Sequence, residues 1–218
     1  MEKQKKVFKN EIKYLIQLNE EQKEAKALIR AHQIVVITGR AGCGKSLVSA
    51  QTALDFIFKK EYESIYVTRA AVEVGHSLGF LPGGLSEKFD PYLEAFKDNL
   101  FECYDKVKIE ELINSEKVKA LPVQFIRGKT INDILIVEEA QNLTKPEMLA
   151  LLTRLGKNGK IVINGDNEQK DIKDPYNGLS YVIDLAKKFS EDIKWVKLKN
   201  NHRSDLVGKI LEYEYSGK

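Results

Sequence analysis

A glycine-rich segment near the start of the chain has the residue types and spacing of a phosphate-binding loop. It matches the pattern G-x-x-x-x-G-K-[ST] and consists of Gly39, Arg40, Ala41, Gly42, Cys43, Gly44, Lys45 and Ser46. Glycines let successive backbone N–H groups turn inward around an anion, and a helix expected from about Lys45 adds its positive dipole end. Lys45 would reach the β- and γ-phosphates, and the Ser46 hydroxyl would bind a magnesium ion. The pattern therefore predicts ATP and Mg²⁺ as cofactors.

Two adjacent carboxylates stand at the end of an apolar run further along the chain. Residues 134–137 read Ile-Leu-Ile-Val and are followed directly by Glu138 and Glu139. Parallel sheets bind ligands at the carboxyl ends of their strands, so we expect both acids beside the glycine-rich loop. Glu138, which continues the strand, would face Ser46 and the magnesium ion, and Glu139 would orient and deprotonate an attacking water. A solvated acidic loop is the alternative interpretation.

A glutamine follows a third apolar run. Residues 165–171 read Gly-Asp-Asn-Glu-Gln-Lys-Asp and follow the run at 161–163. A glutamine amide at that edge can donate to a γ-phosphate oxygen and accept a hydrogen bond from the attacking water. We therefore predict that Gln169 senses the γ-phosphate. Taken alone, the pattern is equally typical of a polar turn.

Three of the six arginines follow predicted strands, namely Arg69, Arg127 and Arg203. Each guanidinium could fork onto oxygens of a transferring phosphoryl group or of a nucleic acid. We expect Arg203 to act on the nucleotide of a neighbouring subunit, because a single core leaves the γ-phosphate open on one side. The nucleic-acid candidates are Arg69, Phe80, Lys88, Phe89, Arg127 and Lys129. For Phe80, packing onto the core is the alternative.

The elements that must position these residues alternate between strands and helices. Short apolar runs predict buried parallel strands at 34–38, 64–68, 123–126, 134–137, 160–163 and 194–198. Helical spacing predicts helices at 47–59, 146–155 and 178–189 and two more within 7–31. The alternation breaks at about 75–119, which we interpret as an insertion with a helix over 89–104. The pattern favours an α/β fold with a mainly parallel sheet and helices on both faces.

The composition indicates a globular protein in a reducing compartment. The chain has 218 residues and a formal net charge of +3, which neither demands nor excludes a nucleic-acid partner. Cys43 and Cys103 form no C-x-x-C pair, and no apolar run approaches the roughly 18 residues that cross a bilayer. We expect a cytoplasmic protein without a membrane partner. It would fold as one domain over 1–218, with an N-terminal helical segment at 1–31.

Together these motifs resemble the PhoH-like family of ATPases, whose core is related to that of superfamily 1 RNA helicases. The resemblance spans roughly residues 19–213 and includes the segments 69–75, 78–83, 88–92, 127–130, 139–142 and 152–156. It implies a P-loop NTPase core of RecA-like type, and it implies that Gln22 reads the edge of the adenine. The chain departs from the family pattern at Glu138, where an aspartate is expected, and at Ser204, where a histidine is usual.

The motifs and the resemblance favour an ATP-hydrolysing motor or remodeller that acts on RNA or another single-stranded nucleic acid. A nucleotide-gated binding module without turnover is one alternative, and a small-molecule P-loop kinase is the other. The paired carboxylates argue against the first, and the lack of an arginine cluster argues against the second. A helicase-type motor closes ATP between two cores. Because this chain has one, we expect a homo-oligomer, and the resemblance implies a hexameric ring.

Overall fold

The computed structural model describes residues 12–70, 85–169, 171–172 and 174–200, together with residues 206, 209 and 213. In the helix that begins at Leu85, side chains are described from residue 93 onward. Phe80 and Arg203 lie outside the described residues, as do the side chains of Lys88 and Phe89. The sequence-based expectations for these four residues therefore remain predictions.

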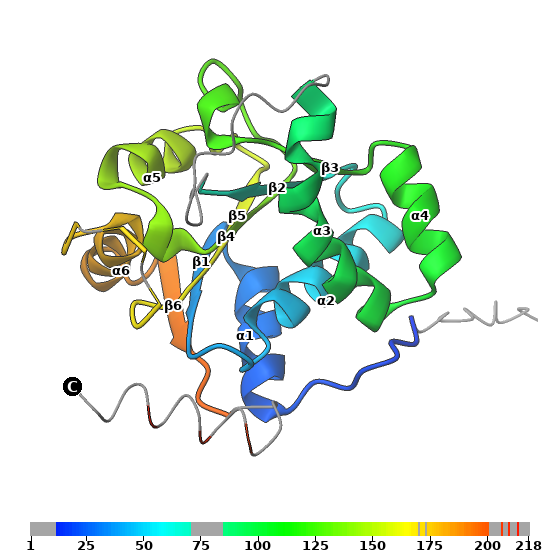
Figure 1. The fold of residues 1–218 in the computed structure, drawn as a ribbon, viewed down its shortest axis with the longest axis horizontal. Helices are drawn as coiled ribbons and strands as arrows, with labels where there is room; N and C mark the ends of the chain where they lie inside the picture. The colour runs from blue at the N-terminus through cyan, green and yellow to red at the C-terminus, as the bar shows by residue number, and fades with distance from the viewer. Residues whose placement is uncertain are drawn as a thin grey trace, which may run out of the picture.

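A sheet of parallel strands forms the centre of the described structure (Figure 1). Its strands are β1 (Ile34–Thr38), β2 (Ile65–Arg69), β3 (Val118–Ala120), β4 (Ile134–Glu138), β5 (Lys160–Gly165) and β6 (Ile193–Lys197). They lie in the order β3-β2-β4-β5-β1-β6, and every neighbouring pair is parallel. β5 therefore lies between β1 and β4. The loops that follow these three strands meet at one edge of the sheet.

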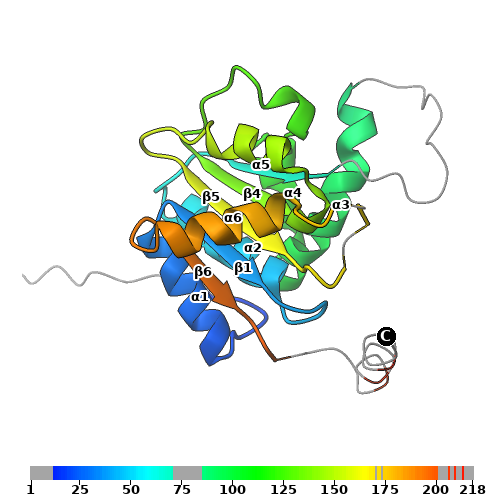
Figure 2. The same cartoon turned by 90° about the vertical axis from the view of Figure 1, so that its left-hand side faces the viewer.

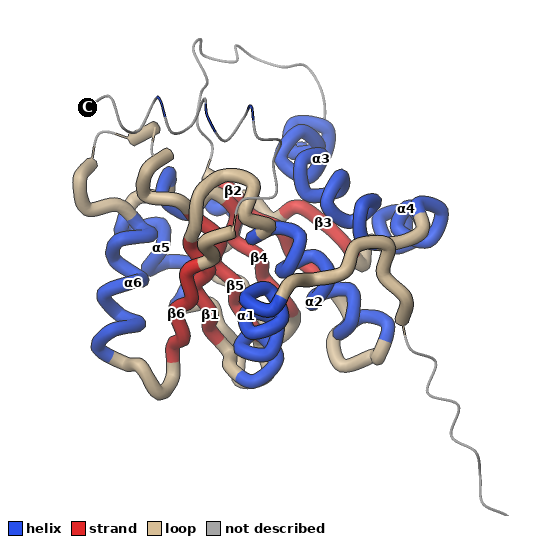
Figure 3. Tube along the Cα trace, turned by 90° about the horizontal axis from the view of Figure 1, so that it is seen from below, coloured by secondary structure: helices blue, strands red, loops and turns tan. Residues whose placement is uncertain are grey.

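Helices cover both faces of this sheet (Figures 1 and 3). One face carries α1 (Glu20–Ala31), α2 (Lys45–Phe58), α3 (Leu85–Cys103) and α4 (Lys106–Asn114). The other carries α5 (Lys145–Leu152) and α6 (Gly178–Lys188), which lie in front of the strands in Figure 2. The expected α/β fold with helices on both faces is confirmed. Among the described helices, none is both long and apolar enough to cross a membrane.

The central strands have apolar residues at consecutive positions because helices cover both faces of the sheet. Along β4, Ile134 and Ile136 pack into the core beneath α2 and α3, whereas Leu135 and Val137 pack into the core beneath α5 and α6. Successive side chains of a strand point to opposite faces, so a strand between two helical layers needs apolar residues at every position. This explains why the predicted strands at 34–38, 134–137 and 160–163 coincide with β1 or lie within β4 and β5.

The strand expected at 123–126 is wrong. Val123–Phe125 form a 3-10 helix, η1, and β3 lies earlier in the chain, at Val118–Ala120. Pro122, which precedes η1, has no N–H to donate to a neighbouring strand. Val123 and Ile126 are both buried, at the spacing of one helical turn. An apolar run this short does not by itself distinguish a strand from a helical turn.

The first of the two helices expected within 7–31 is also wrong in its described part. Residues 12–18, which we call the N-terminal strap, are not helical, and α1 begins only at Glu20. The strap runs across α2. The Tyr14 hydroxyl donates to the Asp55 carboxylate at 2.6 Å, and the Gln51 amide donates to the Ile16 carbonyl at 2.8 Å. The strap makes these contacts with α2 instead of hydrogen bonds within a helix. The apolar spacing of residues 12–18 does not indicate such contacts.

We expect Tyr14→Phe to lower the free energy of unfolding by about 1–2 kcal/mol, because the Asp55 carboxylate loses a partly buried donor. Urea denaturation followed by circular dichroism measures the change. Tyr104→Phe is the matched control, because its ring packs edge-on against Tyr14 and its hydroxyl has no hydrogen bond with the described residues. The control should shift stability by less than about 0.5 kcal/mol. Equal losses in the two variants would contradict a hydrogen-bonded strap.

Candidate functional site

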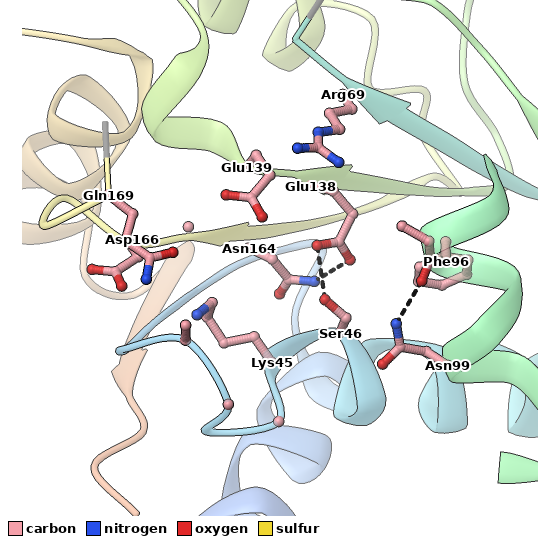
Figure 4. A pocket seen from close by; sticks show the side chains of 15 residues that line it. Lys45, Ser46, Arg69, Phe96, Asn99, Glu138, Glu139, Asn164, Asp166 and Gln169 are labelled. Atoms are coloured by element: carbon pink, nitrogen blue, oxygen red, sulfur yellow. Dashed lines mark hydrogen bonds between the residues drawn. The ribbon is translucent and has the colours of Figure 1, made fainter. Parts of the chain in front are cut away.

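A cavity of about 360 Å³ lies at the carboxyl ends of β1, β4 and β5, where the sequence predicts the phosphate site (Figure 4). Its walls come from the glycine-rich loop after β1, from the ends of β4 and β5 with the residues that follow them, and from one face of α3. Lys45, Ser46, Glu138, Glu139 and Gln169 all line it. The cavity therefore brings together the loop and the three polar side chains that the sequence predicted from separate runs.

The glycine-rich loop has the backbone conformation of an anion-binding nest. Gly39, Gly42 and Gly44 have φ angles of 152°, 84° and 87°, which residues with a Cβ rarely adopt. A side chain at position 39 would also collide with the carbonyl of Leu198, just beyond β6. α2 begins at Lys45, as predicted, so its N-terminal N–H groups and the positive end of its dipole lie at the cavity.

Two cations of the loop have partners within the protein. The Lys45 ammonium donates to the carbonyl of Gly39 at 2.6 Å and to the carbonyl of Arg40 at 3.2 Å. Arg40 pairs with Glu168 at 2.8 Å and so links the loop to the segment after β5. Lys45 has a flexible stem and three donors, so it can exchange these carbonyls for phosphate oxygens.

The Glu138 carboxylate joins α2 to the sheet (Figure 4). Its Oε2 accepts a hydrogen bond from the Ser46 hydroxyl at 2.9 Å, and its Oε1 accepts one from the Asn164 amide at 2.8 Å. Ser49 of α2 in turn bonds to Asn164. Burial raises the pKa of Glu138 above its ordinary value, and the two hydrogen bonds oppose that rise. A cation beside this carboxylate would favour its charged form.

The oxygen atoms of Ser46 and Glu138 fit a magnesium ion. A hydroxyl and a carboxylate oxygen 2.9 Å apart are both hard donors. In nucleotide sites Mg²⁺ takes one or two protein oxygens and completes its shell with phosphate oxygens and water. Within the described part of the chain, no three His, Cys, Asp or Glu side chains are grouped so that they could hold a metal ion on their own. The pair at Ser46 and Glu138 supplies what a nucleotide-bound ion requires from the protein.

Glu139 lies directly after β4 at a sharp bend in the backbone. Its φ of 51° and ψ of 46° fall in the left-handed region, which is uncommon for a residue other than glycine. The carboxylate points into the cavity (Figure 4), where the Gln141 amide donates to it. Strained residues of this kind cluster at functional sites, where the surrounding structure holds them. The left-handed backbone of Glu139 turns its carboxylate in a different direction from that of the preceding Glu138.

Two buried amides that the sequence analysis did not single out hold the two polar loops together. Gln141 donates to the Glu139 carboxylate and to the Gln169 carbonyl, the latter at 3.1 Å, and accepts from the Asp166 N–H at 2.9 Å. Asn142 exchanges hydrogen bonds of 2.8 Å and 2.7 Å with Asp171. The segment that carries Gln169 is thus fastened to the segment that carries Glu139. The sequence signal is a pair of amides that follows the two acids after one alanine, but only the bend shows that both amides turn inward.

Asp166 is a further acid of the cavity that the sequence analysis did not assign. It is buried, and its Oδ2 has no hydrogen-bond partner in the described part of the structure. Burial raises the pKa of this carboxyl above its ordinary value. Together with Glu138 and Glu139 it gives the cavity three carboxylates. The negative charge of a polyphosphate in this cavity would be repelled by the three carboxylates. Its binding therefore requires enough positive charge nearby to offset that repulsion.

Gln22 is buried against the glycine-rich loop. Its side-chain oxygen accepts from the backbone N–H of Asn19, which completes a capping box at the start of α1, and its amide donates to the Cys43 carbonyl at 3.1 Å. A side chain at Gly44 would collide with this amide. The structure therefore places Gln22 beside the loop that the sequence predicts for phosphate. Its role in reading adenine stays a prediction.

Of the three nucleic-acid candidates whose side chains the structure describes, one lines the cavity and two do not. Arg69 lines the cavity beside Glu138, whereas Arg127 and Lys129 are exposed beyond η1 and do not line it. η1 stands where a strand was expected, so the premise that Arg127 follows a strand is wrong.

The model of the family described as PhoH-like protein matches residues 14–214. This chain belongs to the PhoH-like family. A PhoH-like protein of Mycobacterium tuberculosis is 38% identical to it over 197 residues, which cover 87% of this chain and 56% of that protein. The chain thus spans about half the length of the curated PhoH-like relatives that it matches.

Solved structures show the same fold at low sequence identity. The Pif1 helicase of Candida albicans superposes on this PhoH-like chain with a TM-score of 0.50 and 15% identity, over 92% of this chain and 44% of the helicase. The large terminase of a thermophilic bacteriophage gives a TM-score of 0.57 and 10% identity, over 92% of this chain and 51% of the terminase. The PhoH-like core thus has the P-loop NTPase fold that the sequence predicted.

In this PhoH-like chain we expect Gln141→Met to lower ATP turnover by about 10- to 100-fold with ATP affinity within about threefold of the wild type. Methionine fills the same space but cannot donate to Glu139 or accept from Asp166, so the carboxylate and the loop lose their positioning. Steady-state kinetics and equilibrium nucleotide titration measure the two effects. Gln33→Met removes an amide at the opposite edge of the sheet and should change neither. Parallel losses of turnover and affinity in Gln141→Met would instead indicate general misfolding of the site.

Proposed function

We propose that this PhoH-like chain binds ATP together with Mg²⁺ and hydrolyses it. The observation that carries the proposal is the convergence of Lys45, Ser46, Glu138, Glu139 and Gln169 on one cavity. These side chains come from three loops that are far apart in sequence, and together they supply the groups that phosphoryl transfer to water requires. A nest that served only to bind an anion would not need a strained carboxylate held over it.

Each residue of this set has a distinct proposed role. The N–H groups of the loop and the Lys45 ammonium bind the β- and γ-phosphates. Ser46 and Glu138 hold the magnesium ion, which when bound supplies positive charge against the phosphate oxygens. Glu139 accepts a proton from the attacking water, and Gln169 orients that water. Gln141 holds the Glu139 carboxylate and the segment that carries Gln169 in fixed positions relative to each other.

We also propose that the partner is RNA or another single-stranded nucleic acid. The fold is shared with a helicase, and Arg127 and Lys129, two positions apart in the chain, are both exposed and positively charged. Lys88, Phe89 and Phe80 complete the proposed surface, because aromatic rings stack on bases and cations bind the phosphate backbone.

A homo-oligomer is the arrangement that we propose for this chain, with Arg203 reaching the nucleotide of a neighbouring subunit. The chain leaves β6 beside the glycine-rich loop, since the Leu198 N–H donates to the Thr38 carbonyl at 2.8 Å and the next two N–H groups donate to Glu21. The residues leading to Arg203 therefore start at the nucleotide site. A hexameric ring is the form that the resemblance to the family favours.

The ATPase test compares the wild type with Lys45→Ala and Glu139→Gln. Lys45→Ala should abolish tight ATP binding, because the phosphates lose the P-loop lysine. Glu139→Gln should keep binding and lower turnover by about 10²–10⁴, the usual contribution of a positioned general base. Phosphate release and calorimetric titration give the two quantities, each with and without RNA, single-stranded DNA and small metabolites. Tight binding without turnover in the wild type would favour a nucleotide-gated module, and transfer to a metabolite would favour a kinase.

Binding of single-stranded RNA should weaken as salt rises, because phosphate contacts release counterions. The double variant Arg127→Ala/Lys129→Ala should reduce the slope of log affinity against log salt by about 1.4, at about 0.7 for each lost contact. Fluorescence anisotropy at several salt concentrations measures the slope. Lys59→Ala/Lys157→Ala removes the same charge from exposed positions at the opposite edge of the sheet and should leave the slope unchanged. Equal slopes for the wild type and the first double variant would remove these two residues from the interface.

A further inference from the structure

The position of Arg69 in the sheet directs its side chain to the nucleotide site. Arg69 ends β2 and is in register with Glu138, which ends β4. Residues paired in neighbouring parallel strands point to the same face of the sheet, and side chains alternate along each strand. Ile65 and Val67 of β2 pack beneath α2 and α3. Ile134 and Ile136 of β4 pack beneath the same helices. The same alternation places Arg69 and Glu138 on the face where α2 presents Ser46.

The side chain of Arg69 is available for an anion. It lines the cavity with Lys45 and Glu139, and its guanidinium extends toward the carboxylates from above in Figure 4. The Arg69 guanidinium makes no hydrogen bond or ion pair with the described residues. By contrast, Arg30 is paired with Glu61 at 2.9 Å, and Arg40 is paired with Glu168. A guanidinium stays charged at any physiological pH and forks onto two oxygens of one phosphate.

The wall behind Arg69 belongs to the same chain. Ala95, Phe96 and Asn99 of α3 line the cavity on the side of Ser46 and Glu138 (Figure 4). Phe96 is buried, and α3 packs against both α2 and β2. This side of the cavity is therefore covered by α3 of the same chain, and charge interactions are stronger where protein replaces water. A triphosphate with its magnesium ion still lies beside three carboxylates in this cavity, and Lys45 and Arg69 are the two cationic side chains that line it.

We propose that Arg69 binds the γ-phosphate of ATP in its own subunit and stabilises the phosphoryl group as it is transferred. This inference rests on the proposed ATPase function, and it assigns Arg69 to the nucleotide in place of a nucleic acid. During hydrolysis the bond between the γ-phosphorus and the bridging oxygen breaks, and a bond forms to the water oxygen. The water proton passes to Glu139, and ADP leaves with the bridging oxygen. Arg69 remains protonated throughout and compensates the charge on the γ-phosphoryl oxygens.

Nucleotide binding tests the assignment without turnover. Arg69→Ala should lower the affinity for a non-hydrolysable ATP analogue by about tenfold or more, because charge-assisted hydrogen bonds to the γ-phosphate are lost. Affinity for ADP, which has no γ-phosphate, should stay within about twofold of the wild type. Arg154→Ala is the control, because Arg154 follows α5 at the opposite edge of the sheet and should change neither value. Equal losses for the ATP analogue and ADP would overturn the assignment and indicate a structural role.

Turnover without nucleic acid provides the second test. Arg69→Ala should lower kcat by about 10³-fold, within the range for an arginine that stabilises a transferring phosphoryl group. Arg69→Lys should restore part of it, because the charge returns without the fork. If Arg69 instead binds RNA, the variant would keep wild-type kcat in the absence of RNA and lose RNA affinity. A wild type that binds the ATP analogue but does not hydrolyse ATP would refute the proposed ATPase. The comparison of the ATP analogue with ADP would still test Arg69.

Mixed subunits distinguish a residue that acts in its own subunit from one that acts on a neighbour. Lys45→Ala protein mixed with Arg69→Ala protein should stay inactive, because neither subunit holds both cations in one cavity. Recovery of activity in this mixture would overturn the assignment of Arg69 to its own subunit. Lys45→Ala mixed with Arg203→Ala, under the same exchange conditions, should recover activity if Arg203 reaches across an interface. Recovery of activity in this second mixture would show that subunits exchange and that complementation is detectable.

Discussion

The half-buried Glu138 carboxylate makes the interactions on which the site depends. It accepts hydrogen bonds from Ser46 at the start of α2 and from Asn164 in β5, so one side chain ties β4 to the helix that follows β1 and to the strand between them. Replacing Ser46 or Asn164 by a residue that cannot donate would leave one carboxylate oxygen without its hydrogen bond in a largely desolvated position, which costs more than losing a hydrogen bond at the surface. These two hydrogen bonds therefore hold the glycine-rich loop, the residues proposed to bind magnesium and the adjacent strands in one arrangement. A longer acid than the usual aspartate fills this position and still reaches both partners.

Two buried amides hold the segments that carry Glu139 and Gln169, which we propose act on the attacking water. Glu139 is bent away from Glu138 by its left-handed backbone, and Gln141 and Asn142 secure the segment after β5 against that bend. The amides are buried and fully engaged, so they impose one geometry on two loops. α3 adds a wall from the connection between β2 and β3. The connection that the sequence marks as an insertion therefore contributes directly to the cavity.

The sequence predicts most of the fold and the core of the site because both follow from local patterns. Apolar runs without alternation locate β1, β4 and β5, and the glycine pattern locates the start of α2. The strand expected at 123–126 and the helix expected before residue 19 are wrong because their conformation depends on Pro122 and on distant partners in α2. The sequence leaves open whether Arg69 contacts a phosphoryl group or a nucleic acid, because the register that sets it beside Glu138 is known only once β2 and β4 are paired. Gln141 could not be placed, since its role depends on a bend that no local pattern encodes.

The contact between Gly39 and Leu198 has a consequence for the order of events during synthesis. The carbonyl of Leu198 occupies the space that a side chain at position 39 would need, and β6 pairs with β1 along its whole length. The first residue of the glycine-rich loop therefore obtains one of its walls from Leu198, which directly follows β6 near the end of the described chain. Contacts so distant in sequence form slowly, because the entropy of closing the long intervening loop is lost before the contact is made. A nascent chain thus acquires its complete phosphate loop only after nearly all of its other elements are in place.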